Sequence, residues 1–309
     1  DVYKRQVSVP GVIMQFTGKD NSFTYTLTGL IFSCVFCIAV FITWYSTWEA
    51  KDVHQEYDFK VDTQRSSGVI NHLKYLVLDL FSSFRIRAFR LHILIYIFSF
   101  TAMEVFGSVF TYYVVYCLSQ DAAAVSGWLS IAAFASVPGT YGFMLLLNRL
   151  NMTPSAALRL SYSCIFLVLA FLFTVYLTKT EVPTLLFSAV FILLGAARSG
   201  LYYIPWNIYS FIPDIDEIVT QQRREGIFAG VMVLTRKSTV AIAIMIIGLV
   251  LQESGFVKGS GAQPESALGA IIGLMIFATA ALLAVSFFAT YKFKLTRETH
   301  KAVSYTHLR

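Results

Sequence analysis

The chain has 309 residues, of which 56% are hydrophobic and only 14% are charged, and its mean hydropathy is +0.64. Soluble domains carry about 25% charged residues, so the composition excludes a soluble globular protein and predicts one that lies in a lipid bilayer. The net charge of +6 does not indicate nucleic-acid binding, because the basic residues fall in short connections between apolar runs. The cysteines lie inside or beside those runs and support neither a disulfide framework nor a metal site.

Seven apolar stretches are long enough to cross a bilayer, since about 20 helical residues span its hydrocarbon core of roughly 30 Å. Their apolar residues do not alternate with the period of two that a membrane β-barrel requires. The predicted fold is therefore all-α, a polytopic membrane protein with about seven transmembrane helices. The expected spans are 24–47, 91–118, 124–147, 160–178, 184–211, 227–251 and 267–291.

Lys and Arg collect in every second connection, which predicts that those connections are cytoplasmic. The N-terminus then lies outside the cell membrane and the C-terminus inside it. The expected parts are an outer segment with the first helix over 1–48, a cytoplasmic linker over 49–90, a six-helix bundle over 91–295 and a cytoplasmic tail over 296–309. Because the terminal sequences DVYKRQ and SYTHLR fit no helix pattern, we expect the natural protein to continue beyond at least one end.

Four charged residues fall near the middle of predicted spans, where a charge is costly and often functional. They are Glu104, Arg198, Arg236 and Lys237. One interpretation is a Glu104–Arg198 ion pair that merely orders the bundle. Such a pair leaves Arg236 and Lys237 uncompensated, which favours acidic partners elsewhere or an anionic ligand. Alternatively, Arg236 meets Glu104 or the neighbouring helix, since it points about 100° away from Lys237 around its own helix.

Aromatic and amide side chains follow Arg198 in the stretch SGLYYIPWNIYSF. Tyr202, Tyr203, Trp206 and Asn207 occur at helical spacing. Proteins hold sugars in this way, by stacking on the apolar ring face and by hydrogen bonds to the hydroxyls. We predict that these residues bind the solute together with the four charged ones. For Trp206, an interfacial aromatic belt is an equally good interpretation.

Acidic and basic residues crowd the connection before the sixth span. We predict that acid–base pairs among them close the inner mouth of a carrier in one state and release it in another. A solvated loop is the alternative, because surface ion pairs are weak. The residues of this predicted cytoplasmic gate are Asp214, Asp216, Glu217, Arg223, Arg224 and Glu225.

Catalytic patterns are absent from the sequence. The histidines lie in loops or at helix ends, and no Ser, His and acid share a plausible depth in the membrane. There is no glycine-rich phosphate-binding loop that ends in Lys and Ser or Thr. We therefore expect neither an enzyme nor an ATP-driven pump.

The most distinctive stretch is PWNIYSFIPDIDEIVTQQRREGIFAGVMVLTRK, residues 205–237. It resembles the loop between helices ten and eleven of the glycoside–pentoside–hexuronide:cation symporters, the melibiose-carrier-like family of the major facilitator superfamily. FRIRAFRLHILIYIFSF and TYYVVY are similar to the start and end of that family's helix seven. The residues that match the loop pattern are Pro205, Trp206, Pro213, Asp214, Arg223, Arg224, Glu225, Gly226 and Lys237.

The resemblance covers about residues 24–295 as helices six to twelve, so it implies a C-terminal fragment whose partner is a missing N-terminal helix bundle. It implies secondary active transport, by symport of a sugar, glycoside or uronide with sodium or a proton. No other cofactor is implied, and the coupling-ion site would lie mainly in the missing half. Lys237 would line the central cavity. Arg198 and Arg236 match no family pattern, and Asn151 stands where related sequences often have Gly.

Two other functions fit parts of the pattern. A related branch of the superfamily carries lysolipids, so a lysolipid or another organic solute is an alternative cargo. Seven spans with an outside N-terminus is also the topology of a receptor, although the RREG loop and the mid-span charges count against that function. In every case the expected partners are a small molecule and the lipid bilayer, with no nucleic acid.

Overall fold

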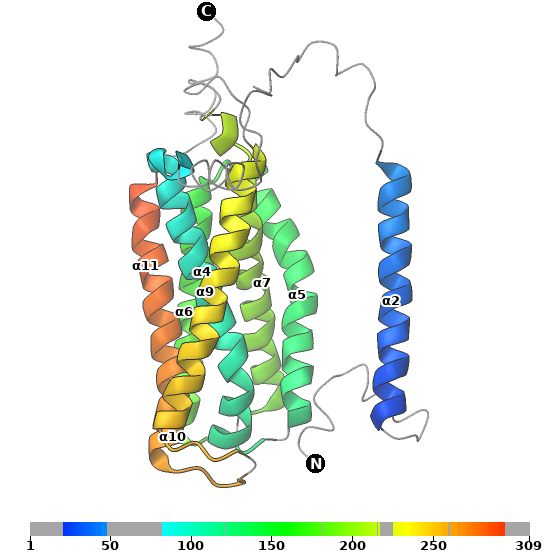
Figure 1. Cartoon of the computed structure of the whole chain (residues 1–309). Helices are drawn as coiled ribbons and strands as arrows, with labels where there is room; N and C mark the ends of the chain where they lie inside the picture. The colour runs from blue at the N-terminus through cyan, green and yellow to red at the C-terminus, as the bar shows by residue number, and fades with distance from the viewer. Residues whose placement is uncertain are drawn as a thin grey trace, which may run out of the picture. The chain divides into compact units, whose positions relative to one another are not determined.

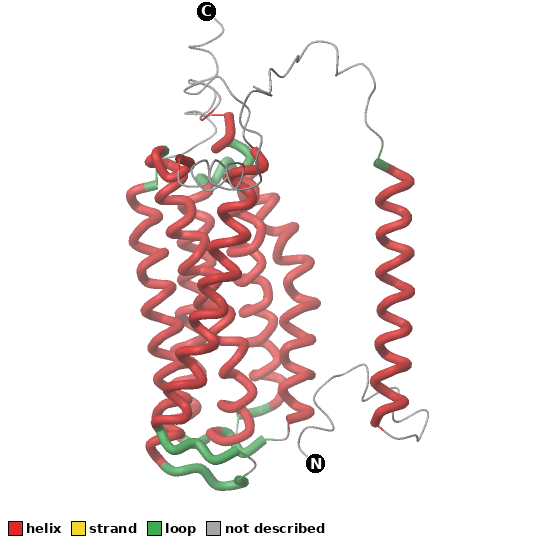
Figure 2. The backbone as a smooth tube through the Cα atoms, viewed as in Figure 1, coloured by secondary structure: helices red, strands yellow, loops and turns green. Residues whose placement is uncertain are grey.

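The computed structural model describes residues 21–47, 82–120, 122–180, 182–214, 216, 225–258 and 260–293. These residues form helices joined by short connections and contain no strand (Figure 2). Among them, seven helices are long and apolar enough to cross a membrane. The prediction of an all-α protein with seven spans is thus confirmed.

The spans follow one another in the predicted order. The seventh and second spans each include a π-helical segment, which joins their α-helical turns without a break. The elements are α2 (Asn21–Ser46), α4 (Arg87–Tyr112) with η4 (Tyr113–Cys117), α5 (Ala122–Asn148), α6 (Pro154–Thr178), α7 (Thr184–Tyr209), α9 (Glu225–Glu253), and α10 (Glu265–Ile272) with η5 (Gly273–Ala278) and α11 (Thr279–Lys292).

The largest difference between a predicted and an observed helix boundary lies in the connection between α5 and α6. The Thr153 side chain accepts a hydrogen bond from the Ala156 backbone N–H, and Pro154 occupies the first turn, so α6 begins at Pro154 rather than near residue 160. Asn151 in the same connection has a φ of 49°. Glycine adopts this left-handed conformation most easily and Asn tolerates it, so Asn fits the backbone at this position.

The chain divides into two compact units, Asp1–Val77 and Leu78–Arg309. In the first unit the described element is α2, and none of its apolar window Gly29–Ser46 is buried. An apolar helix that is exposed on all sides fits a lipid environment or other helices.

The second unit is a bundle of six spans in which α4 is the most buried (Figure 1). α4 packs against α11, α9 and α7, while α5 and α6 both pack against α7. α4 and α9 begin at the end of the bundle where α5, α7 and α11 finish (Figure 1). Residues in the middle of α4, α7 and α9 therefore lie at similar depth.

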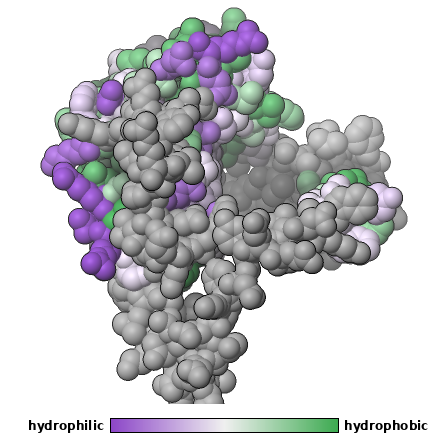
Figure 3. Space-filling view, turned by 90° about the horizontal axis from the view of Figure 1, so that it is seen from above, coloured by the Kyte–Doolittle hydropathy of each residue, from purple (hydrophilic) through white to green (hydrophobic). Residues whose placement is uncertain are grey.

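Hydrophilic residues gather around the rim of the bundle's end at which α4 begins (Figure 3). The described basic residues near this end are Arg85, Arg87, Arg90, Arg149, Arg159 and Lys292, whereas Lys179 and Lys258 lie near the other end. In the folded bundle, too, the described basic residues are thus more numerous at the end that the sequence predicts to be cytoplasmic.

Small residues let α5 and α7 approach closely, as is common between membrane helices. A Cβ atom added to Gly195 would lie 2.0 Å from the Ala132 carbonyl oxygen, and one added to Gly139 would lie 2.6 Å from Ala196 Cα. Neither backbone atom can move aside cheaply. The backbone contact between α5 and α7 therefore requires glycine at both positions.

Gly195→Ala is expected to destabilise the bundle by about 1–3 kcal/mol, because the added methyl group overpacks the contact with α5. A lower apparent Tm of the detergent-solubilised protein would be the readout. Gly142→Ala on α5 is the matched control, since its Cβ would meet nothing within 4 Å. Equal thermal stability of the two variants would contradict the packing argument.

Candidate functional site

A line of side chains runs along one face of α4. His92, Tyr96, Phe100 and Glu104 are spaced four residues apart, so they share one face of the helix. The His92 ring stacks on Tyr96 with centroids 6.4 Å apart, and Tyr96 lies 4.4 Å from Phe100. Three rings therefore lead from the start of α4 to a carboxylate in the central third of its span.

A second line runs along α7. Arg198, Tyr202 and Trp206 are also four residues apart. Arg198 Nη2 donates a 2.8 Å hydrogen bond to the Tyr202 hydroxyl, and the guanidinium carbon lies 5.1 Å from the centre of the same ring. The Arg198 side chain is thus held along its own helix.

Edge-to-face ring contacts join the two lines. Phe100 meets Tyr202 with centroids 4.6 Å apart, and Tyr96 meets Trp206 at 6.2 Å. Aromatic pairs prefer such geometry because the positive edge of one ring faces the negative face of the other. The contacts fix α4 and α7 so that Arg198 and Glu104 belong to one region of the bundle.

Arg236 on α9 completes the region. Its guanidinium lies 4.5 Å above the centre of the Phe100 ring, and Nη2 is 3.6 Å from Glu104 Oε1. The side chains remain 30% and 35% exposed, respectively, so the pair is open to a ligand. We call these seven residues the charged aromatic cluster: Tyr96, Phe100, Glu104, Arg198, Tyr202, Trp206 and Arg236.

The ion pair is one of the two that the sequence suggested for Glu104. Glu104 pairs with Arg236 and not with Arg198, because the Glu104 face of α4 turns toward α9. Arg198 is left with the Tyr202 hydroxyl and has no carboxylate partner among the described residues. The Glu104–Arg198 interpretation is therefore wrong.

Two buried polar atoms lie at the start of the α4 line, one in the cluster and one next to it. The Tyr96 hydroxyl and His92 Nε2 have no hydrogen bond of good geometry within the described part of the chain, although the Arg236 guanidinium interacts electrostatically with the Tyr96 hydroxyl. Sequence reasoning overlooked Tyr96 and Phe100. Their spacing of four from Glu104 was the signal that would have found them.

Lys237 does not share the surroundings of its neighbour Arg236. Consecutive helical residues differ by about 100° in direction, and Lys237 is exposed where Arg236 is partly buried. Its ammonium group has no carboxylate partner among the residues that the structure describes. Among the described mid-span residues, Arg236 thus has a carboxylate partner, whereas Lys237 and Arg198 have none.

The other two predicted solute-binding residues of α7 do not join the cluster. Tyr203 packs against the main hydrophobic core, one residue round from Tyr202. Asn207 is partly buried, and its backbone oxygen accepts a hydrogen bond from the Ser210 hydroxyl. Trp206 is 41% exposed, so an open ring edge remains available beside Tyr96.

The predicted gate is described in part. Asp214 is partly buried, Asp216 is 1% exposed, and Glu225 begins α9. The Tyr209 hydroxyl donates a 2.6 Å hydrogen bond to the Glu225 backbone oxygen, which ties the end of α7 to the start of α9. Glu217, Arg223 and Arg224 lie outside the described residues.

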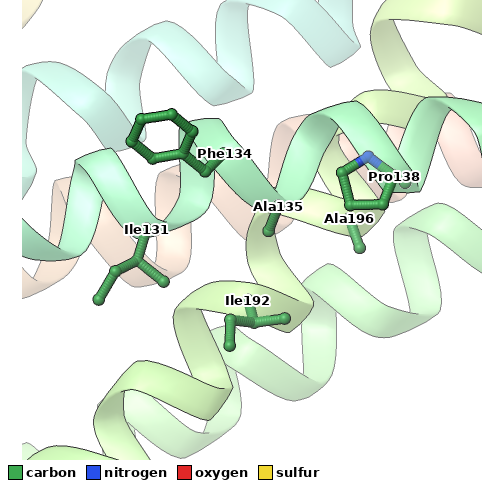
Figure 4. Close-up of a pocket in the computed structure, with 7 residues that line it drawn as sticks. Ile131, Phe134, Ala135, Pro138, Ile192 and Ala196 are labelled. Carbon is green, nitrogen blue, oxygen red and sulfur yellow. The ribbon is translucent and has the colours of Figure 1, made fainter.

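An open apolar groove lies elsewhere, between α5 and α7. Figure 4 shows Ile131, Phe134, Ala135 and Pro138 on one side and Ile192 and Ala196 on the other. These side chains offer no hydrogen bond to a polar solute, and none belongs to the charged aromatic cluster. Within the described residues, no three His, Cys, Asp or Glu side chains gather as a metal site would require.

The described helices are those of a polytopic membrane protein. A family model described as MFS/sugar transport protein matches residues 6–297, and the chain belongs to this family of the major facilitator superfamily. The description of this family is that of a transport protein, and not of an enzyme or a receptor. An uncharacterized symporter of Synechocystis sp. is 30% identical over 227 residues, which make up 70% of this chain and 40% of that protein. This chain thus spans less than half of the length of the symporter from Synechocystis sp..

Proposed function

We propose that the protein is a cation-coupled symporter of a sugar, glycoside or uronide, similar to the melibiose carrier, and that the charged aromatic cluster binds the solute. The observation that carries this proposal is the cluster itself. Glu104, Arg198 and Arg236 lie in the central third of three spans. Arg236 lies over the Phe100 ring and pairs with Glu104, and Arg198 lies over the Tyr202 ring.

The chemistry of the cluster favours a sugar over a lysolipid. Sugars present an apolar ring face, which stacks on aromatic rings, and hydroxyls, which need donors and acceptors. Trp206 and Tyr202 supply rings, Glu104 supplies an acceptor, and Arg198 supplies donors. A lysolipid needs a long apolar channel in addition to polar groups, and the open groove between α5 and α7 lies apart from the cluster.

Two further observations support symport across the cell membrane. The similar protein from Synechocystis sp. is called a symporter, and the basic rim at the end where α4 begins fits a cytoplasmic side with the C-terminus inside. The coupling ion would be sodium or a proton.

Uptake of labelled glucosides and glucuronides tests the proposal, with the protein expressed from its complete gene in proteoliposomes. Accumulation driven by a sodium or proton gradient supports it. Uptake of lysophospholipid without uptake of either sugar would contradict it, because the cargo would then belong to a different class.

We also propose that the connection from α7 to α9 is the inner gate, with Asp214, Asp216, Glu217, Arg223, Arg224 and Glu225 as its charged residues. The hydrogen bond from Tyr209 to the Glu225 backbone holds the two helices together on this side. The burial of Asp216 favours a packed connection over a fully solvated loop.

Tyr209→Phe is expected to change the rate of solute exchange more than the solute Kd. The lost hydrogen bond is worth about 0.5–1.5 kcal/mol, which corresponds to roughly a twofold to tenfold change in rate. Exchange kinetics and equilibrium binding measured side by side would separate the two effects. The control is Tyr141→Phe, because Tyr141 is an exposed residue on α5. Unaltered exchange by Tyr209→Phe would remove this residue from the gate.

A further inference from the structure

Two neighbouring helices of the bundle, α6 and α11, carry one charged residue each. Arg159 is the charged residue of α6, and Lys292 is that of α11. Both lie near the end of the bundle where α4 begins, which has the basic rim. The Ser155 hydroxyl donates a 2.9 Å hydrogen bond to the Phe293 carbonyl oxygen and so ties the start of α6 to the end of α11. The two cations therefore lie beside the same helix–helix contact.

The Arg159 side chain is held against a ring of α11. Its guanidinium carbon lies 4.6 Å from the centre of the Tyr291 ring, and Tyr291 is 59% exposed. A guanidinium that stacks in this way gives its face to the ring and keeps its five N–H donors in its own plane, where two of them can reach the oxygens of a phosphate. The stack therefore orients a phosphate-binding group at the surface of the contact between α6 and α11.

Aromatic side chains continue from this stack toward the middle of the membrane. The centre of the Phe287 ring lies 5.6 Å from that of Tyr291 and 5.7 Å from that of Phe288. On α6, the Phe166 ring lies 6.2 Å from Phe287. Phe288 is 67% exposed and lies three residues before Tyr291, so the two share one face of α11. The surface next to the Arg159 stack is therefore apolar and suits an acyl chain.

The α6–α11 side of the bundle is the side that suits lipid. The mid-span charged residues lie on α4, α7 and α9, and charges at that depth are costly in contact with lipid. Along η5 and α11, by contrast, the exposed residues before Tyr291 are all apolar, namely Phe277, Ala281, Val285 and Phe288. Arg159 and Lys292 thus lie where an apolar surface reaches the membrane interface, at which Arg, Lys and Tyr side chains are typically found.

We propose that Arg159, Tyr291 and Lys292 bind the headgroup of an anionic phospholipid, with one of its acyl chains along Phe288. The lipid phosphate accepts hydrogen bonds from the guanidinium, and the net negative charge of the headgroup attracts both cations. A zwitterionic phospholipid offers the same phosphate, but its own cation opposes that attraction. The site is separate from the charged aromatic cluster and does not depend on which solute the protein carries.

Lipid binding to the purified protein from the complete gene tests the site. Native mass spectrometry would give the Kd values of dioleoylphosphatidylglycerol and dioleoylphosphatidylcholine, which share their acyl chains and differ in headgroup charge. We expect the unmodified protein to bind the anionic lipid at least tenfold more tightly. An excess of inorganic phosphate should not displace this lipid, because phosphate has no acyl chain to contact Phe288. Displacement by phosphate would assign the site to a free anion and overturn the lipid proposal.

Variants of the stack should change the preference between the two lipids. Arg159→Gln should reduce the preference for the anionic lipid about tenfold, as for the loss of a charged hydrogen bond. Arg159→Lys keeps the charge but loses the planar fork, so it should retain part of the preference. Tyr291→Leu removes the ring that orients the guanidinium, so it should reduce the preference severalfold, and it serves if the Arg159 variants do not fold. Phe288→Ser should weaken both lipids alike, because they share their acyl chains.

The control is Lys179→Gln. Lys179 follows the last turn of α6 at the other end of the same helix, so this variant removes an equal charge away from the site and should leave the preference intact. If the unmodified protein binds the two lipids equally, or if Arg159→Gln changes the preference no more than Lys179→Gln does, the site is overturned. The same spectra would reveal a dimer. A dimer that Arg159→Gln dissociates would mean that a second copy of the chain covers this face, which would also overturn the lipid proposal.

Discussion

Lys237→Ala is expected to abolish cation-driven uptake while the protein still inserts into the membrane. The ammonium group lies in the central third of α9, exposed and without a carboxylate among the described residues. A lysine at that depth costs several kcal/mol unless it is paired, and an apolar side chain would pack there at no such cost. We therefore propose that Lys237 acts in the coupled cation–solute site, as its match to the symporter pattern implies.

Uptake would be measured at equal membrane expression, with and without an imposed cation gradient. Ser238→Ala is the matched control, because Ser238 is the next exposed residue on α9 and carries no charge. Lys237→Arg keeps the charge and should retain part of the coupling. Near-normal uptake by Lys237→Ala that still responds to the gradient would exclude Lys237 from the coupled site.

Glu104→Gln is expected to lower solute affinity about tenfold or more, because it leaves the half-buried Arg236 without its carboxylate. Arg236→Gln should also weaken binding, but it should keep more gradient-driven uptake than Lys237→Ala. In the double variant neither charge remains unpaired. The two losses should therefore not add.

A double-mutant cycle measures this coupling. Residues in one ion pair typically show a coupling free energy of about 0.5–3 kcal/mol, and we expect a value in that range from the four Kd values. Additive effects would mean that the 3.6 Å contact contributes nothing to binding.

The spans were predictable because each is a continuous apolar stretch of sufficient length, and the mid-span charges stand out against it. The choice between the possible partners of Glu104 was not predictable. Depth alone allows Glu104 to pair with Arg198 or with Arg236, and the rotation of α4 turns it toward Arg236 on α9. Depth follows from residue counting, but rotation follows from packing against several neighbours at once.

Helix rotation also decides which partners the aromatic side chains contact. The sequence groups Tyr202 with Tyr203, but about 100° of helical rotation sends Tyr202 to Phe100 and Tyr203 to the main core. Isolated aromatic residues in an apolar helix are usually core, and Tyr96 and Phe100 are both buried in a hydrophobic core cluster. Only their contacts with Trp206 and Arg236 distinguish them.

Solute accumulation against a concentration gradient is the most direct test of the central claim, that the charged aromatic cluster binds the sugar of a cation-driven symporter. The protein from the complete gene would be placed in proteoliposomes with labelled glucuronide and an inward sodium or proton gradient. The account predicts accumulation above the outside concentration, collapse of that accumulation on addition of an ionophore, and its loss in Arg198→Gln. Uptake that never exceeds equilibrium, or accumulation that Arg198→Gln leaves intact, would contradict it.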